Sequence, residues 1–188
     1  MLSTNRPKVP VGWSPDGRFI LYIAPGVDDH QVTLWVLPLS GDRKPFPFAE
    51  IDTLAGSGQF SRDGRWIAYV SGETGRDEVY IASFPDSGRK TRVSSSGGSY
   101  PRWRRDGTEL FYITPIPEAK LMSASLVRRG AAVEVGAVRT LFDPHVSRSG
   151  RYMYDVSPDG QRFLVNTIDE AAQPINVVLN WPAALIKR

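Results

Sequence analysis

The sequence predicts an all-β protein built from four similar antiparallel sheets. A ten-residue phrase, WSPDGRFILY at 13–22, returns as FSRDGRWIAY at 60–69. An Asp-Gly pair occurs four times, with spacings of 47, 43 and 53 residues. Each pair precedes a run rich in β-branched and aromatic residues, which favour strands. Four-stranded units that repeat every ~40 to 50 residues are typical of β-propeller blades.

Alignment on Asp-Gly places apolar side chains at the same offsets in each unit. The residues three before the Asp are Trp13, Phe60, Trp103 and Val156. The residues four after it are Ile20, Ile67, Leu110 and Phe163. The residues six after it are Tyr22, Tyr69, Tyr112 and Val165. A parallel β-helix would need a much shorter repeat, and a sandwich would not repeat its turn, so propeller blades are the interpretation that fits.

The Asp-Gly pairs themselves predict tight turns between strands. Gly tolerates a positive φ, and Asp bonds the backbone of its own turn. We therefore expect each of these carboxylates to hold its turn by accepting backbone N–H bonds. A shared calcium site is not expected from them, because the repeat places one turn in each blade.

The strands follow in the same order in every unit. The strand after the turn is predicted at 19–24, 66–71, 109–114 and 162–167. The next strand is predicted at 32–38, 78–84, 120–127 and 175–181. A shorter last strand is predicted at 44–48, 90–95 and, less clearly, 131–142. No window shows a convincing helical period, except that 182–188 could form one turn.

These strands predict one propeller over residues 1–188, with blades at about 9–50, 55–96, 98–143 and 150–181. An open row of four blades would expose two apolar blade faces. The chain therefore either closes with a second copy into a larger ring or is a fragment of a longer propeller.

Composition excludes several classes of protein. The apolar fraction of 41% is enough for a core, and no run is long enough for a membrane helix. The absence of cysteine excludes disulfides and thiolate sites. No signal peptide is expected at the N-terminus, and both a cytoplasmic and a periplasmic location stay open. The net charge of +3 gives little reason to expect nucleic-acid binding.

The quoted phrases, together with VSPDGQRFLV at 156–165, resemble the TolB-like, WD-type β-propeller repeat over nearly the whole chain. The third unit, WRRDGTELFY, lacks the Ser-Pro of that pattern, and the fourth has Val165 in place of the last Tyr. The C-terminal segment is similar to the end of soil-bacterial proteins in which a kinase or DNA-binding domain precedes such a propeller. The resemblance implies rings of six or more blades and a sensory or scaffolding role.

Metal-binding and catalytic candidates come mainly from one acidic loop. Asp28 and Asp29, with Asp155, are candidate calcium ligands because carboxylate oxygens suit that ion. His30 in the same loop and His145 in the link before the fourth unit are the catalytic candidates. A Ser–His hydrolase is not favoured, because no Gly-x-Ser-x-Gly elbow is present. A solvated turn is the simpler interpretation of the acidic loop.

Binding candidates cluster in YPRWRRDG at 100–107. Tyr100, Arg102 and Arg104 surround Trp103, which falls on an apolar position of the repeat and should lie in the core. The two arginines are then predicted to line a rim or the channel. The sequence thus favours a non-catalytic propeller that binds a protein or a small ligand at its loop ends or central mouth. The alternative is a calcium-dependent hydrolase of lactones or esters at that mouth.

Overall fold

The computed structural model describes residues 7–25, 32–51, 58–130, 132–146 and 153–167, and the backbone of 176–178. Fifteen strands and their turns make up this part of the chain, and no helix occurs in it. Within it, therefore, nothing has the length and apolar character of a membrane-spanning helix. The predicted all-β fold is confirmed, while the turn predicted at 182–188 lies outside the described residues.

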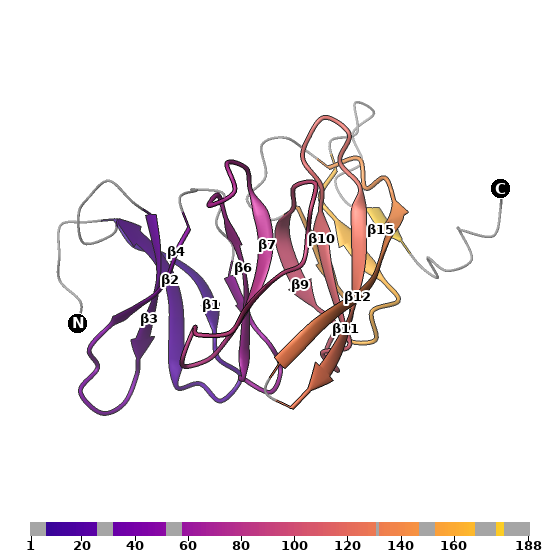
Figure 1. The fold of residues 1–188 in the computed structure, drawn as a ribbon. Coiled ribbons are helices and arrows are strands. Elements are labelled where there is room, and N and C mark those ends of the chain that lie inside the picture. Colours follow the sequence, from indigo (N-terminus) through magenta and orange to yellow (C-terminus); the bar gives the residue numbers. More distant parts are fainter. Residues whose placement is uncertain are drawn as a thin grey trace.

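Four antiparallel sheets follow one another along the chain (Figure 1). The first contains β1 (Val9–Trp13), β2 (Phe19–Pro25), β3 (Val32–Pro38) and β4 (Phe46–Glu50). The second contains β5 (Gly58–Phe60), β6 (Trp66–Ser71), β7 (Glu78–Ser83) and β8 (Lys90–Arg92). The third contains β9 (Ser99–Trp103), β10 (Glu109–Ile113), β11 (Leu121–Arg129) and β12 (Ala132–Phe142). The fourth contains β13 (Tyr154–Val156), β14 (Phe163–Val165) and β15 (Asn176–Val178).

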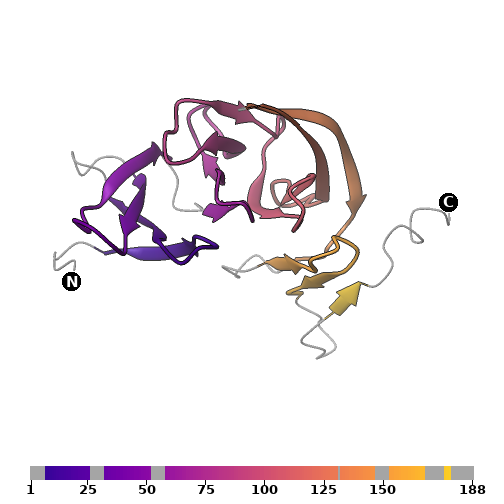
Figure 2. The same ribbon diagram turned by 90° about the horizontal axis from the view of Figure 1, so that it is seen from below.

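Strand order in each sheet equals chain order, so every sheet is a simple meander. Viewed along the sheets, the first strand of each lies on the inner side of a curved row of blades (Figure 2). Inner strands of successive blades contact one another, β1 with β5, β5 with β9 and β9 with β13. This is the radial arrangement of a propeller.

The Asp-Gly turns carry the hydrogen bonds that the sequence predicts. In the first blade Ser14 Oγ donates to Asp16 Oδ1 at 2.6 Å, and the Arg18 N–H donates to the same oxygen at 3.0 Å. The amide of Phe19 donates to Ser14 Oγ at 2.9 Å. Gly17 has a φ of 73°, which a residue without Cβ adopts at no steric cost. The second and fourth blades repeat this network.

The third blade uses a different residue for the same purpose. It lacks the Ser two positions before the Asp, and Thr108 takes its place. The Thr108 hydroxyl and amide both donate to Asp106 Oδ1, at 2.7 and 3.0 Å. Although the third blade departs from the repeat at RRDGT, the carboxylate of Asp106 still accepts hydrogen bonds that hold its turn.

The core lies between the blades, in three clusters of buried side chains. The central strands β6 and β10 are buried along their whole length, because each lies between two neighbouring blades. Trp103 is 7% exposed and packs with Trp66 and Val70 of the second blade, which confirms its predicted place in the core. In the fourth blade, by contrast, Leu164 of β14 is 49% exposed.

Candidate functional site

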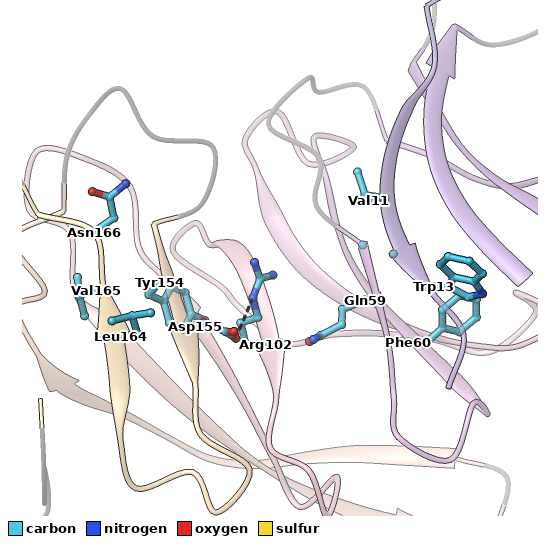
Figure 3. Close-up of a pocket in the computed structure, with 12 residues that line it drawn as sticks. Val11, Trp13, Gln59, Phe60, Arg102, Tyr154, Asp155, Leu164, Val165 and Asn166 are labelled. Atoms are coloured by element: carbon cyan, nitrogen blue, oxygen red, sulfur yellow. Dashed lines mark ion pairs between the residues drawn. The ribbon is translucent and has the colours of Figure 1, made fainter. Parts of the chain in front are cut away.

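A cavity of about 710 Å³ lies on the inner side of the row of blades. Its walls come from the inner strands of all four blades and from β14 (Figure 3). The polar lining residues are Gln59, Arg102, Asp155 and Asn166. The large apolar ones include Val11, Trp13, Phe60, Tyr154 and Leu164.

Four lining residues occupy one position of the repeat, four before the Asp of the turn. They are Gly12, Gln59, Arg102 and Asp155. Equivalent positions on equivalent inner strands face the same axis, so the repeat itself gathers these residues. From the first blade to the fourth, this position therefore holds a glycine, a neutral amide, a cation and an anion, so each blade presents a different chemistry to the cavity.

Arg102 is the most constrained charged group of the cavity. Its side chain is 14% exposed, and its Nη1 donates to the carbonyl of Pro101 at 3.0 Å. The guanidinium lies 6.0 Å from the ring centroid of Tyr154, and its Nε lies 3.8 Å from Asp155 Oδ1. Arg102 thus has a fixed position, while the Asp155 side chain stays 73% exposed.

Gln59 joins the second and third blades. Its Oε1 accepts the backbone N–H of Trp103 at 2.8 Å, and its carbonyl accepts Trp103 Nε1–H at 3.1 Å. These two bonds satisfy both N–H groups of a nearly buried tryptophan. Gln59 therefore orients one wall of the cavity as well as lining it.

Tyr154 joins the third and fourth blades in a similar way. Its hydroxyl donates to the carbonyl of Tyr100 at 2.9 Å. Burial raises the pKa of the Tyr154 hydroxyl far above its usual value, so this group is a neutral donor at ordinary pH. Burial raises the pKa of Tyr100 as well.

The structure brings two of the predicted site residues together and separates the others. Arg102 and Asp155 lie side by side in the cavity (Figure 3). Arg104 instead lies at the Asp-Gly turn, where it pairs with Glu109 at 3.0 Å and Asp106 at 3.2 Å. Tyr100 contributes its carbonyl to Tyr154 and packs its ring against the third core cluster.

Only some of the predicted catalytic and metal-binding residues lie in the part of the chain that the structure describes. The side chain of His145 is 82% exposed, and its Nδ1 lies 3.1 Å from the carbonyl of Asp143. Asp28, Asp29 and His30 lie outside the described residues. Among the residues that are described, no three His, Cys, Asp or Glu side chains gather as metal ligands.

Sequence reasoning missed Trp13, Gln59, Tyr154 and Asn166 as cavity residues. The signal that could have found Gln59 was the Asp-Gly alignment, because one inner-strand position recurs in every unit. Nothing comparable marks Asn166, whose place depends on how the fourth blade packs.

No family model matches the chain. Crystallised TolB from Acinetobacter baumannii is similar in structure, with a TM-score of 0.69 at 17% identity, over 95% of this chain and 42% of that one. The chain has the fold of a TolB-like β-propeller. A putative TolB from Agrobacterium tumefaciens gives a TM-score of 0.64 at 21% identity, over 93% of this chain and 58% of that one.

One curated protein is also similar in sequence to much of the chain. An uncharacterized protein of Agrobacterium fabrum is 24% identical over 171 residues, which are 87% of this chain and 56% of the relative. The propeller thus spans about half the length of the relative and the TolB structures that it matches. Enzymes share this fold too, since an oligogalacturonate lyase in complex with manganese has a TM-score of 0.61 at 12% identity, over 97% of this chain and 53% of the lyase.

Proposed function

We propose that this TolB-like propeller is a non-catalytic binding module, and that its inner-strand cavity takes a short polar segment of a protein partner. The observation that carries the proposal is the convergence of Gly12, Gln59, Arg102 and Asp155 on one cavity. A volume of about 710 Å³ lies within the range of ~300 to 1,000 Å³ that ligand sites occupy.

The chemistry of the cavity favours a peptide-like ligand. Arg102 offers planar donors that match a carboxylate or a carbonyl, and Asp155 offers an exposed acceptor beside it. Trp13, which is 63% exposed, offers an apolar surface at the edge of the same cavity. A peptide segment with backbone amides, one charged side chain and one apolar side chain could bind to Arg102, Asp155 and Trp13 at the same time.

The test is selection of peptides from a random display library on the immobilised 188-residue chain. Selected peptides should lose about ten-fold in affinity for Arg102→Ala, the cost of one charge-assisted hydrogen bond, as measured by fluorescence polarisation. The matched control is Arg105→Ala, which removes the same charge from an exposed turn residue and should leave affinity unchanged.

Two results would contradict the proposal. One is that no selected peptide depends on Arg102. The other is that Arg105→Ala weakens binding as much as Arg102→Ala, because the effect would then be general charge attraction.

A calcium-dependent hydrolase of lactones or esters is the second candidate. One observation favours it: Asp155 presents an exposed carboxylate to the cavity. Further ligands would have to come from Asp28 and Asp29, and the bound ion would polarise the substrate carbonyl.

A further inference from the structure

Three neighbouring inner strands present polar side chains side by side to the cavity. β9, which carries Arg102, contacts β5 with Gln59 and β13 with Asp155. Figure 3 shows Gln59 and Asp155 on either side of Arg102. Because the three residues occupy the same position of the repeat, the order of the blades sets the order of their chemistry along the cavity wall.

Arg102 carries more hydrogen-bond donors than the described residues satisfy. A guanidinium has N–H donors on all of its nitrogens. Nη1 donates to the carbonyl of Pro101 at 3.0 Å, whereas Nε lies 3.8 Å from Asp155 Oδ1, which is too long for a hydrogen bond. The side chain is only 14% exposed, and a cation this buried is normally paired with an anion at hydrogen-bond distance. The cavity therefore suits a carboxylate at Arg102.

Gln59 adds a second donor on the adjacent strand. The backbone N–H of Trp103 donates to Gln59 Oε1 at 2.8 Å, and only the oxygen of an amide accepts such a bond, so this contact fixes the orientation of the amide. The amide nitrogen then lies at the other end of the group. Within the described part of the chain, this nitrogen donates to no protein acceptor. Its N–H groups are therefore available to a ligand.

Asp155 provides an acceptor on the other side of Arg102. Its Oδ1 accepts the backbone N–H of Val156 at 2.9 Å, which restrains the carboxylate. Its side chain is 73% exposed, so the second oxygen is open to the cavity. The wall thus runs from two donors, Gln59 and Arg102, to one acceptor.

The C-terminal residue of a chain carries the matching groups. Its carboxylate oxygens and its N–H nitrogen are joined through Cα and the carboxyl carbon, and standard bond lengths place them about 3 Å apart. That spacing is similar to the 3.8 Å between Arg102 Nε and Asp155 Oδ1. An internal peptide unit fits less well, because its planar trans geometry points C=O and N–H in opposite directions. A Glu side chain also fits less well, because a flexible stem separates its carboxylate from its own N–H.

We infer that the cavity captures the free C-terminus of a partner chain, an inference that rests on the proposed function. The terminal carboxylate binds the Arg102 guanidinium with two parallel hydrogen bonds and accepts a further bond from Gln59. The N–H of the last residue donates to Asp155. The residues before the terminus lie along the rest of the cavity.

The first test changes the ligand and leaves the protein intact. Two display libraries are selected on the immobilised chain, one with free peptide C-termini and one with both peptide ends tethered. Only the first should yield peptides whose binding depends on Arg102. A selected peptide made with a C-terminal amide should bind about 10- to 100-fold more weakly than the free acid by fluorescence polarisation, because charge-assisted hydrogen bonds are lost.

The second test asks whether Arg102 is the residue that recognises the carboxylate. Arg102→Ala should abolish the preference for the acid, so that the acid and the amide bind equally. Arg102→Lys keeps the charge without the planar fork and should retain only part of the preference. The matched control is Arg105→Ala in the exposed turn, which should keep the full preference.

The third test concerns the N–H of the last residue. Methylation of this nitrogen removes the donor to Asp155 and should weaken binding about ten-fold. In Asp155→Ala the methylated and unmethylated peptides should bind equally. The control is Asp42→Ala, which removes the same carboxylate from the exposed turn between β3 and β4 and should preserve the ten-fold difference.

The outcomes distinguish this inference from the proposed function. If Arg102-dependent peptides bind equally well as acid and amide, or come equally from the tethered library, C-terminal capture is wrong and the peptide-binding cavity stands. If neither library yields an Arg102-dependent peptide, both are wrong. A preference for the acid that persists in Arg102→Ala also overturns the inference, because the carboxylate then binds elsewhere.

Discussion

The hydroxyl of Tyr154 donates a hydrogen bond of 2.9 Å to the backbone carbonyl of Tyr100. Tyr154 is 2% exposed, and Tyr100 has a φ of 57°, in the left-handed region that few side chains adopt. The bond therefore ends on a part of β9 whose conformation is itself unusual. It fixes the inner strand of the fourth blade, and with it Asp155, against the third blade.

Tyr154→Phe should destabilise the chain by ~1 to 2 kcal/mol, because it leaves the Tyr100 carbonyl without its partner while keeping the ring. Urea denaturation followed by tryptophan fluorescence measures the loss. Tyr154→Leu removes the ring as well and should cost more. Equal stability of Tyr154→Phe and the wild type would show that the bond adds nothing to the blade junction.

Gln59→Ala should destabilise the chain by ~1 to 3 kcal/mol, since the buried N–H of Trp103 then lacks an acceptor. The control is Gln161→Ala, which removes the same side chain from the turn of the fourth blade and should stay within ~0.5 kcal/mol of the wild type. Thermal unfolding of both variants checks this. A larger loss of stability in Gln161→Ala than in Gln59→Ala would mean that the bond between Gln59 and Trp103 does not explain the effect.

Acid should weaken the second blade through Asp63. Burial opposes the charged form, yet bonds from Ser61 and the Arg65 amide and the Arg128 guanidinium 2.7 Å away together lower the pKa of Asp63. The carboxylate therefore adds stability above the unfolded pKa of about 3.9 and loses it as pH falls through the lower folded pKa.

Asp63→Asn should accordingly cost ~1 kcal/mol at neutral pH and flatten the fall of the melting temperature between about pH 5 and pH 2. Asp16→Asn is the matched control in the first blade, where Arg18 lies 4.0 Å away and both side chains are exposed, so its effect should be smaller. Identical pH profiles for Asp63→Asn and the wild type would contradict the assignment.

Calcium distinguishes the two candidate functions. A non-catalytic module predicts that added calcium leaves the melting temperature unchanged, because only a bound ligand stabilises the folded state. Differential scanning calorimetry with calcium and with chelator measures this. A calcium-dependent rise together with lactone hydrolysis that chelator abolishes would instead support the hydrolase.

Most of the architecture could be predicted from local signals. The Asp-Gly turns and the strands after them were predicted correctly because their bonds and their burial depend on nearby residues. The ends of strands were less predictable: the run predicted at 162–167 forms a strand only over Phe163–Val165. β12 gave a weak signal because six of its eleven residues are exposed, five of them in a row, so that its burial does not alternate.

The cavity was predictable only in part. The prediction that Arg102 and Arg104 line a rim or channel depended on alternation from Trp103, and Arg102 does line the cavity. β9 ends at Trp103, however, so Arg104 follows the geometry of the turn and pairs with Glu109. Alternation of apolar and polar residues predicts which face of a strand is buried. It does not predict which residues of different blades come into contact, because those contacts depend on strand register and sheet twist.

The Asp-Gly turns affect how the chain folds while the ribosome is still synthesising it. Their hydrogen bonds join residues only two to five positions apart, as in Ser14, Asp16 and Phe19. Contacts this local form early, because closing a short loop costs little entropy. Each hairpin can therefore form as soon as it is synthesised. Each new sheet can then pack against the sheet that precedes it in the chain.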